Sequence, residues 1–189
     1  MRTVLLYGDS NTWGHMPGTG ERFTRDERWP VRLQRALGDD WEVIAEGLGG
    51  RTATVDRPDS EGRNGLPYLL PCLHSHRPLD LVVIFLGTND VNFVEDDRIA
   101  SCVARLVRIV RTSEAGRDFG APEVLVVVPP PFDGHALGPS FRAELDCELL
   151  DLDGITSYPV VDDDVEHLDA EGHAAVARAV EERMRLLLA

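Results

Sequence analysis

The sequence predicts an α/β protein in which a central parallel sheet lies between two layers of helices, a three-layer α/β/α sandwich. Short, continuous apolar runs rich in β-branched residues are typical of strands that are buried on both faces. Helical patterns separate these runs along the chain, and strands that alternate with helices indicate a parallel sheet. No repeat or linker-like tract interrupts the alternation over 189 residues. We therefore expect a single domain over residues 1–189.

The expected elements follow one another at short intervals. The expected strands are Val4–Tyr7, Trp41–Ala45, Leu81–Leu86 and Val124–Val128, and a last short apolar stretch follows at Tyr158–Val161. The expected helices are Trp29–Leu37, Asp97–Val110 and Ala170–Leu188, each with apolar residues at helical spacing. Pro30 lies near the start of the first helix and Gly38 just past its end, as is usual for helix termini. The segment from Pro71 to Pro78 is expected to be an exposed connection.

Residues with chemically useful groups follow the carboxyl ends of the expected strands. Active sites of parallel α/β sheets lie outside those ends. Ser10 follows the first strand, Gly50 the second and Asn89 the third. Asp164 and His167 follow the last apolar stretch. We therefore expect these five residues to meet at one edge of the sheet.

Ser10, His167 and Asp164 are the candidate nucleophile, base and orienting acid. A serine hydroxyl is a poor nucleophile until a base takes its proton, and a carboxylate fixes the tautomer of that base. The segment Gly8-Asp9-Ser10 also suits an ordinary turn and helix N-cap, and the acidic residues 162–164 also suit a solvated surface. All three groups together favour a serine hydrolase.

Two further residues lie near the candidate base. His173 is expected to be structural, at the opening of the final helix. Glu166 is expected to raise the imidazole pKa of His167 and to flatten the pH–rate profile, because a neighbouring carboxylate favours the charged imidazole.

Acyl transfer also requires hydrogen-bond donors for a developing oxyanion, and these donors are often the largest single stabilising contribution. The candidates are the N–H of Ser10, the N–H of Gly50 and the side-chain amide of Asn89. Glycine allows the backbone to approach a substrate closely, and asparagine supplies an uncharged donor. An ordinary loop at 47–50 and a β-turn at 87–90 are the alternatives.

Four residues are candidates for substrate binding: Asp9, Trp13, Phe93 and Pro130. Trp13, Phe93 and the loop Pro129–Pro131 are expected to form walls of an acyl pocket, with core packing as the alternative. No metal and no other cofactor is expected. His74 and His76 are the nearest approach to a metal motif, but no cysteine or carboxylate cluster accompanies them in the sequence.

The net charge argues against two classes of partner, and the cysteine content indicates the cellular location. The 19 basic and 33 acidic residues give a net charge of −14, so we expect no nucleic acid and no membrane as a partner. No apolar run approaches the ~20 residues that span a bilayer. The three scattered cysteines predict reduced thiols in a cytoplasmic protein. A secretory signal is not expected, because cleavage after ~15–30 residues would remove Ser10.

Four short blocks together resemble the SGNH hydrolases, also called the GDSL esterase/lipase family. The blocks are Gly8-Asp9-Ser10, Gly50, Gly87-Thr88-Asn89-Asp90 and Asp164-x-x-His167. They stand in the family's order and span residues 8–167. The resemblance implies a flavodoxin-like sandwich and ester hydrolysis without a metal. It also implies that Ser10 is the nucleophile, His167 the base and Asp164 its orienting acid. Ser10, Gly50 and Asn89 would supply the oxyanion hole.

Further motifs resemble the bacterial arylesterase/acyltransferase branch of that family. They are residues 8–14, Arg28-Trp29-Pro30, Glu46-Gly47-Leu48, Arg51-Thr52, residues 65–69 and residues 78–81. This resemblance implies hydrolysis of short-chain esters of small molecules, with acyl transfer to alcohols or peroxide in some members and homo-oligomers in several. The chain departs from the branch in a short segment between Pro131 and Asp164 and in Val165-Glu166, where a small or apolar pair is more usual.

Other enzyme classes fit less well. An α/β-hydrolase needs Gly-x-Ser-x-Gly, and Thr12 stands at the last glycine position. A dinucleotide-binding loop that starts at Gly47 would need glycine where Thr52 stands. The remaining alternatives are a carbohydrate O-acetyl esterase or a thioesterase on the same triad, and a binding module that has lost turnover.

Overall fold

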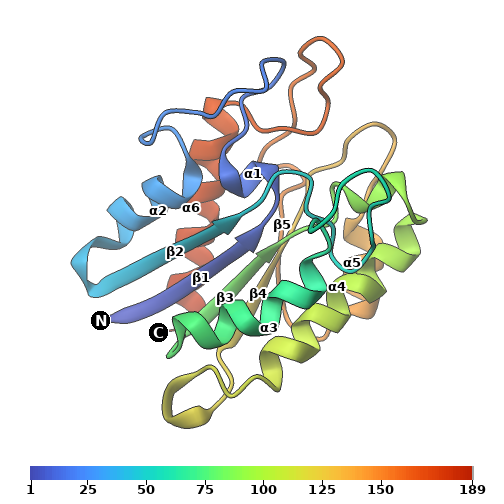
Figure 1. Cartoon of the computed structure of the whole chain (residues 1–189). Helices are drawn as coiled ribbons and strands as arrows, with labels where there is room; N and C mark the ends of the chain where they lie inside the picture. Colours follow the sequence, from blue (N-terminus) through green and yellow to red (C-terminus); the bar gives the residue numbers. More distant parts are fainter. Residues whose placement is uncertain (189) are drawn as a thin grey trace.

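A computed structural model describes residues 1–188 and contains a five-stranded sheet between two layers of helices (Figure 1). The strands are β1 (Arg2–Gly8), β2 (Trp41–Gly47), β3 (Leu81–Phe85), β4 (Glu123–Val128) and β5 (Glu148–Asp151). Their order is β2-β1-β3-β4-β5, and every neighbouring pair is parallel. This is the strand order of flavodoxin-like folds. The predicted fold class is confirmed.

The helices divide between the two faces of the sheet. α2 (Trp29–Leu37) and α6 (Ala170–Leu187) cover one face, and α3 (Gly65–His76), α4 (Asp96–Arg111) and α5 (Gly138–Glu144) cover the other (Figure 1). A single turn, α1 (Ser10–Trp13), follows β1, and short 3₁₀ turns occupy Gly38–Asp40, Asp90–Asn92 and Arg117–Phe119. The expected helix over Trp29–Leu37 is confirmed at both ends. None of the helices in residues 1–188 is long and apolar enough to cross a bilayer.

The two cores lie on opposite faces of the same central strands. Successive side chains of a strand point to opposite faces, so Leu5 and Tyr7 of β1 pack under α3 and α4 while Val4 and Leu6 pack under α2 and α6. All of these side chains are fully buried. β2 was expected to be buried on both faces, but it is the edge strand and is only partly buried.

Three elements were absent from the sequence-based prediction, namely α3, α5 and β5. The expected exposed connection from Pro71 to Pro78 is wrong, because residues 71–76 belong to α3. Pro67 lies in the first turn of this helix, where backbone N–H groups have no partner within the helix. Pro71 removes one hydrogen bond, but burial of Leu69 and Leu73 stabilises the helix.

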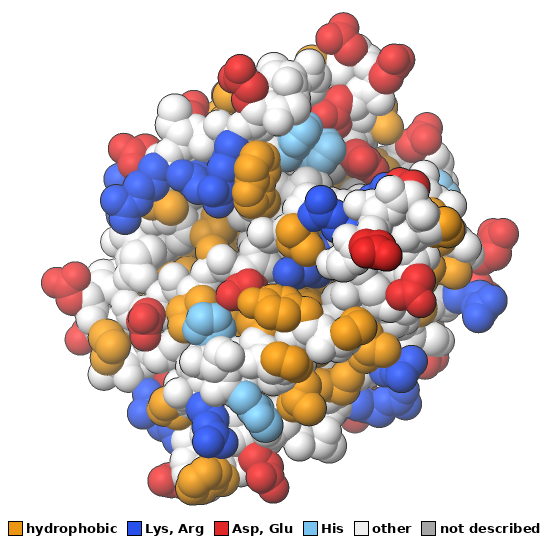
Figure 2. All heavy atoms as spheres, viewed as in Figure 1, with side chains coloured by type: hydrophobic (Ala, Val, Ile, Leu, Met, Phe, Trp, Pro, Cys, Tyr) orange, Lys and Arg blue, Asp and Glu red, His pale blue; other side chains and the backbone are white. Residues whose placement is uncertain are grey.

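α3 also lacks the alternation of polar and apolar faces that identifies a surface helix. Tyr68 and Leu70 are 45% and 42% exposed, and hydrophobic side chains gather over this helix on the face shown in Figure 2. The apolar stretch Tyr158–Val161 forms no strand. Val160 is 77% exposed, and Val161 makes a single bridge with Asp164.

Candidate active site

The tight turn between β1 and α1 places Ser10 at the carboxyl edge of the sheet. A Cβ at Gly8 would lie 2.1 Å from Oγ1 of Thr12 and 3.0 Å from the carbonyl oxygen of Phe85, so only glycine fits there. Asp9 then caps α1, because its Oδ1 accepts a hydrogen bond from the N–H of Asn11 at 2.9 Å. Ser10 is the first residue of this helix and is 7% exposed.

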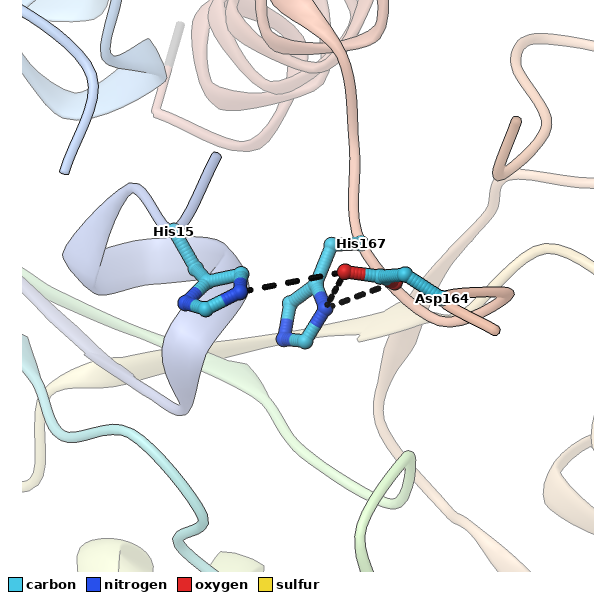
Figure 3. Close-up of side chains that lie close together, drawn as sticks. All are labelled: His15, Asp164 and His167. Atoms are coloured by element: carbon cyan, nitrogen blue, oxygen red, sulfur yellow. Dashed lines mark hydrogen bonds and ion pairs between the residues drawn. The ribbon is translucent and has the colours of Figure 1, made fainter. Parts of the chain in front are cut away.

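His167 lies between Ser10 and Asp164. Its Nε2 is 2.9 Å from Oγ of Ser10. Figure 3 shows its other side, where Nδ1 is 2.9 Å from each carboxylate oxygen of Asp164. The carboxylate only accepts hydrogen bonds when ionised, so it holds the imidazole proton on Nδ1 and leaves Nε2 to accept from the serine hydroxyl. The N–H groups of Gly18 and Glu166 donate to the same carboxylate at 3.1 and 3.3 Å. They fix its orientation.

The site favours an ionised acid and a neutral base. Burial would raise the pKa of the Asp164 carboxyl, but hydrogen bonds from His167 and Gly18 hold that pKa below its usual range. Burial lowers the pKa of the His167 imidazole, more than the hydrogen bond to Asp164 raises it. The expectation that Glu166 raises the His167 pKa is therefore wrong. Burial instead raises the pKa of Glu166 itself, with a further contribution from Asp164.

His15 joins the site, although the sequence analysis did not single it out. Its ring centroid is 4.0 Å from that of His167, and its Nε2 is 3.8 Å from Oδ2 of Asp164 (Figure 3). Positive charge on His15 lowers the pKa of the His167 imidazole. The only signal in the sequence is that His15 follows Ser10 by five residues.

The three candidate oxyanion donors come from three loops at this edge. Gly50 has φ +72°, and a Cβ there would lie 2.6 Å from Nη1 of Arg57, so the position requires glycine. Among residues 1–188, no acceptor faces the N–H of Ser10 or of Gly50. Nδ2 of Asn89 donates to the carbonyl oxygen of Arg51 at 3.1 Å and lies 3.4 Å from Oδ2 of Asp9. Asn89 thus lies against the turn that carries Ser10.

Two buried charged residues hold these loops together, and neither was identified from the sequence as a support. The Arg51 guanidinium donates to the carbonyl oxygens of Gly8, at 2.9 Å, and of Glu46. Both carboxylate oxygens of Asp90 lie 3.0 Å from the N–H of Ala53. Burial raises the pKa of the Asp90 carboxyl to about 7. Arg51 and Asp90 are 3% and 0% exposed, whereas residue type alone suggests solvated surface charges.

A cavity of about 450 Å³ opens beside Ser10. Its lining consists of Ser10, Trp13, His15, Gly20, Gly47, Leu48, Gly49 and Arg63. Trp13 is therefore a wall of this cavity, as expected, and the Arg22 guanidinium stacks 4.8 Å from its ring. A larger hollow of about 630 Å³ between residues 153–157 and α6 contains none of the triad residues.

The other three candidates for substrate binding lie outside this lining. Asp9 is fully buried and caps α1, where its carboxylate accepts a hydrogen bond from the N–H of Asn11. Burial raises the pKa of its carboxyl to about 7. Phe93 is 36% exposed and packs against the Arg57 guanidinium. Pro130 is buried.

His76 has neighbours that were not apparent from the sequence. Its Nε2 is 3.0 Å from Oε1 of Glu46, and together with Cys72 these residues place three potential ligand atoms within 4.8 Å of one another. Burial raises the pKa of the Cys72 thiol to about 12, so the thiol is protonated at neutral pH. In the folded chain a cysteine and a carboxylate therefore lie beside His76, although the sequence around His74 and His76 shows no such cluster. His173 is fully buried, as expected of a structural residue, and its Nδ1 accepts from the N–H of Trp29 at 3.3 Å.

Comparisons with known proteins show a family and similar solved structures. A sequence profile of the GDSL-like lipase/acylhydrolase family matches residues 6–175. A carbohydrate acetylesterase family member from Sinorhizobium meliloti is 38% identical, with a TM-score of 0.89 over 100% of this chain and 99% of that one. The M. smegmatis aryl esterase is 35% identical, with a TM-score of 0.91 over 100% of both chains. No significant match was found among curated proteins.

Proposed function

The chain belongs to the GDSL-like lipase/acylhydrolase family and is a carboxylic ester hydrolase, and from this premise we propose that it hydrolyses short-chain esters of small molecules through an acyl-enzyme on Ser10. The observation that carries the proposal is the line of hydrogen bonds from Oγ of Ser10 through His167 to Asp164, each 2.9 Å long. A neutral imidazole with its proton held on Nδ1 is the form that accepts a proton from serine.

In the first half of the reaction, Oγ of Ser10 attacks the ester carbonyl carbon while Nε2 of His167 takes the hydroxyl proton. The C–O bond to the leaving alcohol then breaks, and the imidazolium returns that proton to the departing oxygen. Asp164 stabilises the imidazolium without taking a proton itself, because its pKa is held below the usual range.

In the second half, a water molecule takes the place of the alcohol. Nε2 of His167 removes a proton from the water, and the resulting oxygen nucleophile attacks the acyl carbon. Collapse of the tetrahedral intermediate releases the carboxylic acid and returns the proton to Oγ of Ser10. An alcohol that enters instead of water receives the acyl group, so acyl transfer uses the same steps.

The tetrahedral intermediates carry negative charge on the former carbonyl oxygen. The free N–H groups of Ser10 and Gly50 are two donors for that oxygen, and Nδ2 of Asn89 is the third. Nδ2 of Asn89 already donates to the Arg51 carbonyl oxygen at 3.1 Å and to Oδ2 of Asp9 at 3.4 Å, so the oxyanion is proposed to replace the longer contact to Asp9. Donors fixed before the reaction do not have to reorganise during it.

The size and lining of the cavity support short acyl groups. At about 450 Å³ it lies in the lower part of the range for small-molecule sites, roughly 300–1,000 Å³. Its walls include the Trp13 ring and the Leu48 side chain, whereas His15 and Arg63 make the rest polar. An acetyl group fits a cavity with both apolar and polar walls better than a long alkyl chain does.

The polar part of the lining also favours a second candidate, a carbohydrate O-acetyl esterase. His15 and Arg63 offer hydrogen bonds to sugar hydroxyls, and two similar structures, 38% and 33% identical to this chain, are described as carbohydrate acetylesterases. Both candidates use the same nucleophile and base and differ in the alcohol part of the ester.

The proposal is tested by hydrolysis of p-nitrophenyl acetate, butyrate and octanoate with the wild type and Ser10→Ala. We expect the rate to fall as the acyl chain lengthens and to drop to background in the variant. Ser101→Ala, on the exposed surface of α4, is the matched control and should keep the full rate. Turnover that survives in folded Ser10→Ala overturns the mechanism. A higher kcat/KM on acetylated sugars than on aryl acetates, lost in Ser10→Ala, favours the second candidate.

A further inference from the structure

The side chain of Asn11 joins the turn that carries Ser10 to the loop that carries His167. Its Nδ2 donates to the carbonyl oxygen of Glu166 at 2.9 Å, and its Oδ1 accepts from the N–H of Leu168 at 2.9 Å. Glu166 and Leu168 are the two chain neighbours of His167. One side chain, next to the nucleophile in sequence, therefore holds the backbone on both sides of the base.

The loop around His167 has few other hydrogen bonds to the body of the fold, although the Leu168 side chain is buried in the core. Between Asp164 and the start of α6 at Ala170, residues 165–168 make no backbone–backbone hydrogen bond within the described chain. The N–H of Glu166 donates to the Asp164 carboxylate at 3.3 Å, which is a contact inside the same loop. Asn11 is thus the link between this loop and the body of the fold at the carbonyl of Glu166 and the N–H of Leu168.

Asn11 is itself held rigidly. It is 1% exposed, and its backbone N–H donates to Oδ1 of Asp9 at 2.9 Å. The hydroxyl of Tyr158, also buried, lies 3.4 Å from Nδ2. Because Asn11 is fixed in this way, a displacement of the His167 loop requires the hydrogen bond to Glu166 or the hydrogen bond from Leu168 to break.

We propose that Asn11 is a positioning residue that sets the distance between Nε2 of His167 and Oγ of Ser10. The inference rests on the proposed function, in which these two atoms exchange the proton. Their separation of 2.9 Å is the quantity that Asn11 maintains. A misplacement of about 1 Å at a reacting centre lowers the rate by ~10²-fold.

The chemistry of the two contacts explains why an amide is suited to the position. The Glu166 carbonyl needs a donor and the Leu168 N–H needs an acceptor, and an asparagine side chain presents one of each. An ionised aspartate at position 11 would satisfy the N–H and repel the carbonyl oxygen. A protonated aspartate would satisfy both. Leucine, of similar size, would satisfy neither.

The test compares Asn11→Leu and Asn11→Asp with Thr12→Val in the p-nitrophenyl acetate assay. Thr12 is the matched control, because it is 2% exposed in the same helix and its hydroxyl has no hydrogen-bond partner in residues 1–188. We expect Asn11→Leu to lower kcat by about 10- to 100-fold with KM within about threefold, and Thr12→Val to change neither. Folding of each variant is checked by its melting temperature.

The pH dependence of Asn11→Asp separates positioning from a general loss of stability. The titratable side chains in contact with position 11 are those of Asp9 and Tyr158, whereas Glu166 contacts it through its backbone carbonyl. Position 11 is buried, and burial raises the pKa of a carboxyl group. The new carboxyl therefore becomes protonated as the pH falls towards 5.5, and its O–H then donates to the carbonyl oxygen of Glu166. The ratio of kcat for this variant to kcat for the wild type should therefore rise as the pH falls.

Three results would overturn the inference: kcat of Asn11→Leu within threefold of the wild type, an equal loss in Thr12→Val, or a flat pH ratio for Asn11→Asp. If Asn11→Leu does not fold, the pH ratio decides. Ser10→Ala in the same assay distinguishes failure of the proposed function from failure of the positioning role. Activity that survives in Ser10→Ala defeats the proposed function, whereas inactive Ser10→Ala with fully active Asn11 variants defeats the positioning role alone.

Discussion

Replacement of Asp164 by asparagine should disable proton transfer while it preserves the shape of the site. The carboxylate accepts hydrogen bonds from Nδ1 of His167 and from the N–H groups of Gly18 and Glu166. An asparagine has one acceptor oxygen for these three donors. When its NH₂ faces the imidazole, the ring takes the tautomer with the proton on Nε2, and that nitrogen no longer accepts the proton of Ser10.

The expected loss of kcat in Asp164→Asn has two causes, the change of imidazole tautomer and the loss of the carboxylate charge. In serine hydrolases with this arrangement, the same substitution lowers kcat by ~10⁴-fold. The carboxylate here lies 2.9 Å from Nδ1 through both oxygens, so it also stabilises the imidazolium that forms during catalysis. We expect kcat to fall about 10³- to 10⁴-fold, which corresponds to roughly 4–5.5 kcal/mol of transition-state stabilisation.

The assay is steady-state hydrolysis of p-nitrophenyl acetate by wild type, Asp164→Asn and Asp163→Asn. Asp163 is exposed in the same loop and is the control for the effect of a lost charge. We expect Asp163→Asn to keep kcat and Asp164→Asn to keep KM within a few fold. Retention of more than a tenth of kcat in folded Asp164→Asn, or an equal loss in Asp163→Asn, would refute the assigned role of Asp164.

Three other predictions concern the oxyanion donor, the base and a buried acid. Asn89→Ala should lower kcat by about 10²- to 10³-fold with little change in KM, and an unchanged kcat would remove this residue from the oxyanion hole. Because burial lowers the pKa of His167, the acid limb of the kcat/KM profile should lie below pH 6.5; an inflection above that value would contradict the shift. Burial raises the pKa of Asp90 from 3.8 to about 7, so the folded state holds a proton that the unfolded state releases, and stability falls as pH rises between these values. Asp90→Asn should therefore gain roughly 2 kcal/mol relative to the wild type between pH 5.5 and 8.5 in chemical denaturation, and an equal pH dependence of both proteins would count against it.

Secondary structure was predictable where the signals were local. Pro30 and Gly38 stand at the ends of α2, and the apolar residues between them repeat with the period of a helix, so its bounds were found directly. The same reasoning failed for α3. Pro71 and Pro78 suggested an exposed connection, and exposed Tyr68 and Leu70 removed the polar face that would have indicated a helix. Packing of Leu69, Cys72 and Leu73 against the sheet stabilises α3, and such packing cannot be recognised from a short stretch of sequence.

The reactive groups were predictable because each has a chemistry of its own. A serine after a buried strand, and an aspartate three residues before a histidine, are few enough in the chain to be recognised. Their convergence follows from a general property of parallel sheets, in which the loops at the carboxyl ends of the strands share one edge. Trp13 was identified by its closeness to Ser10, whereas the burial of Asp9, directly before Ser10, was not predicted because burial cannot be read from position alone.

By itself, the sequence determined the fold class, the strands β1 to β4, the helices α2, α4 and α6 and the identity of the nucleophile, base and acid candidates, because these depend on local periodicity and residue type. Only the tertiary structure decided that His15 lies against His167, that Arg51 supports Gly8, and that Asn11 brackets the base. These contacts join residues between 43 and 157 positions apart. The physical reason is that hydrogen bonds and burial depend on distance in the folded chain, and the pKa values of His167 and Asp90 follow from that burial.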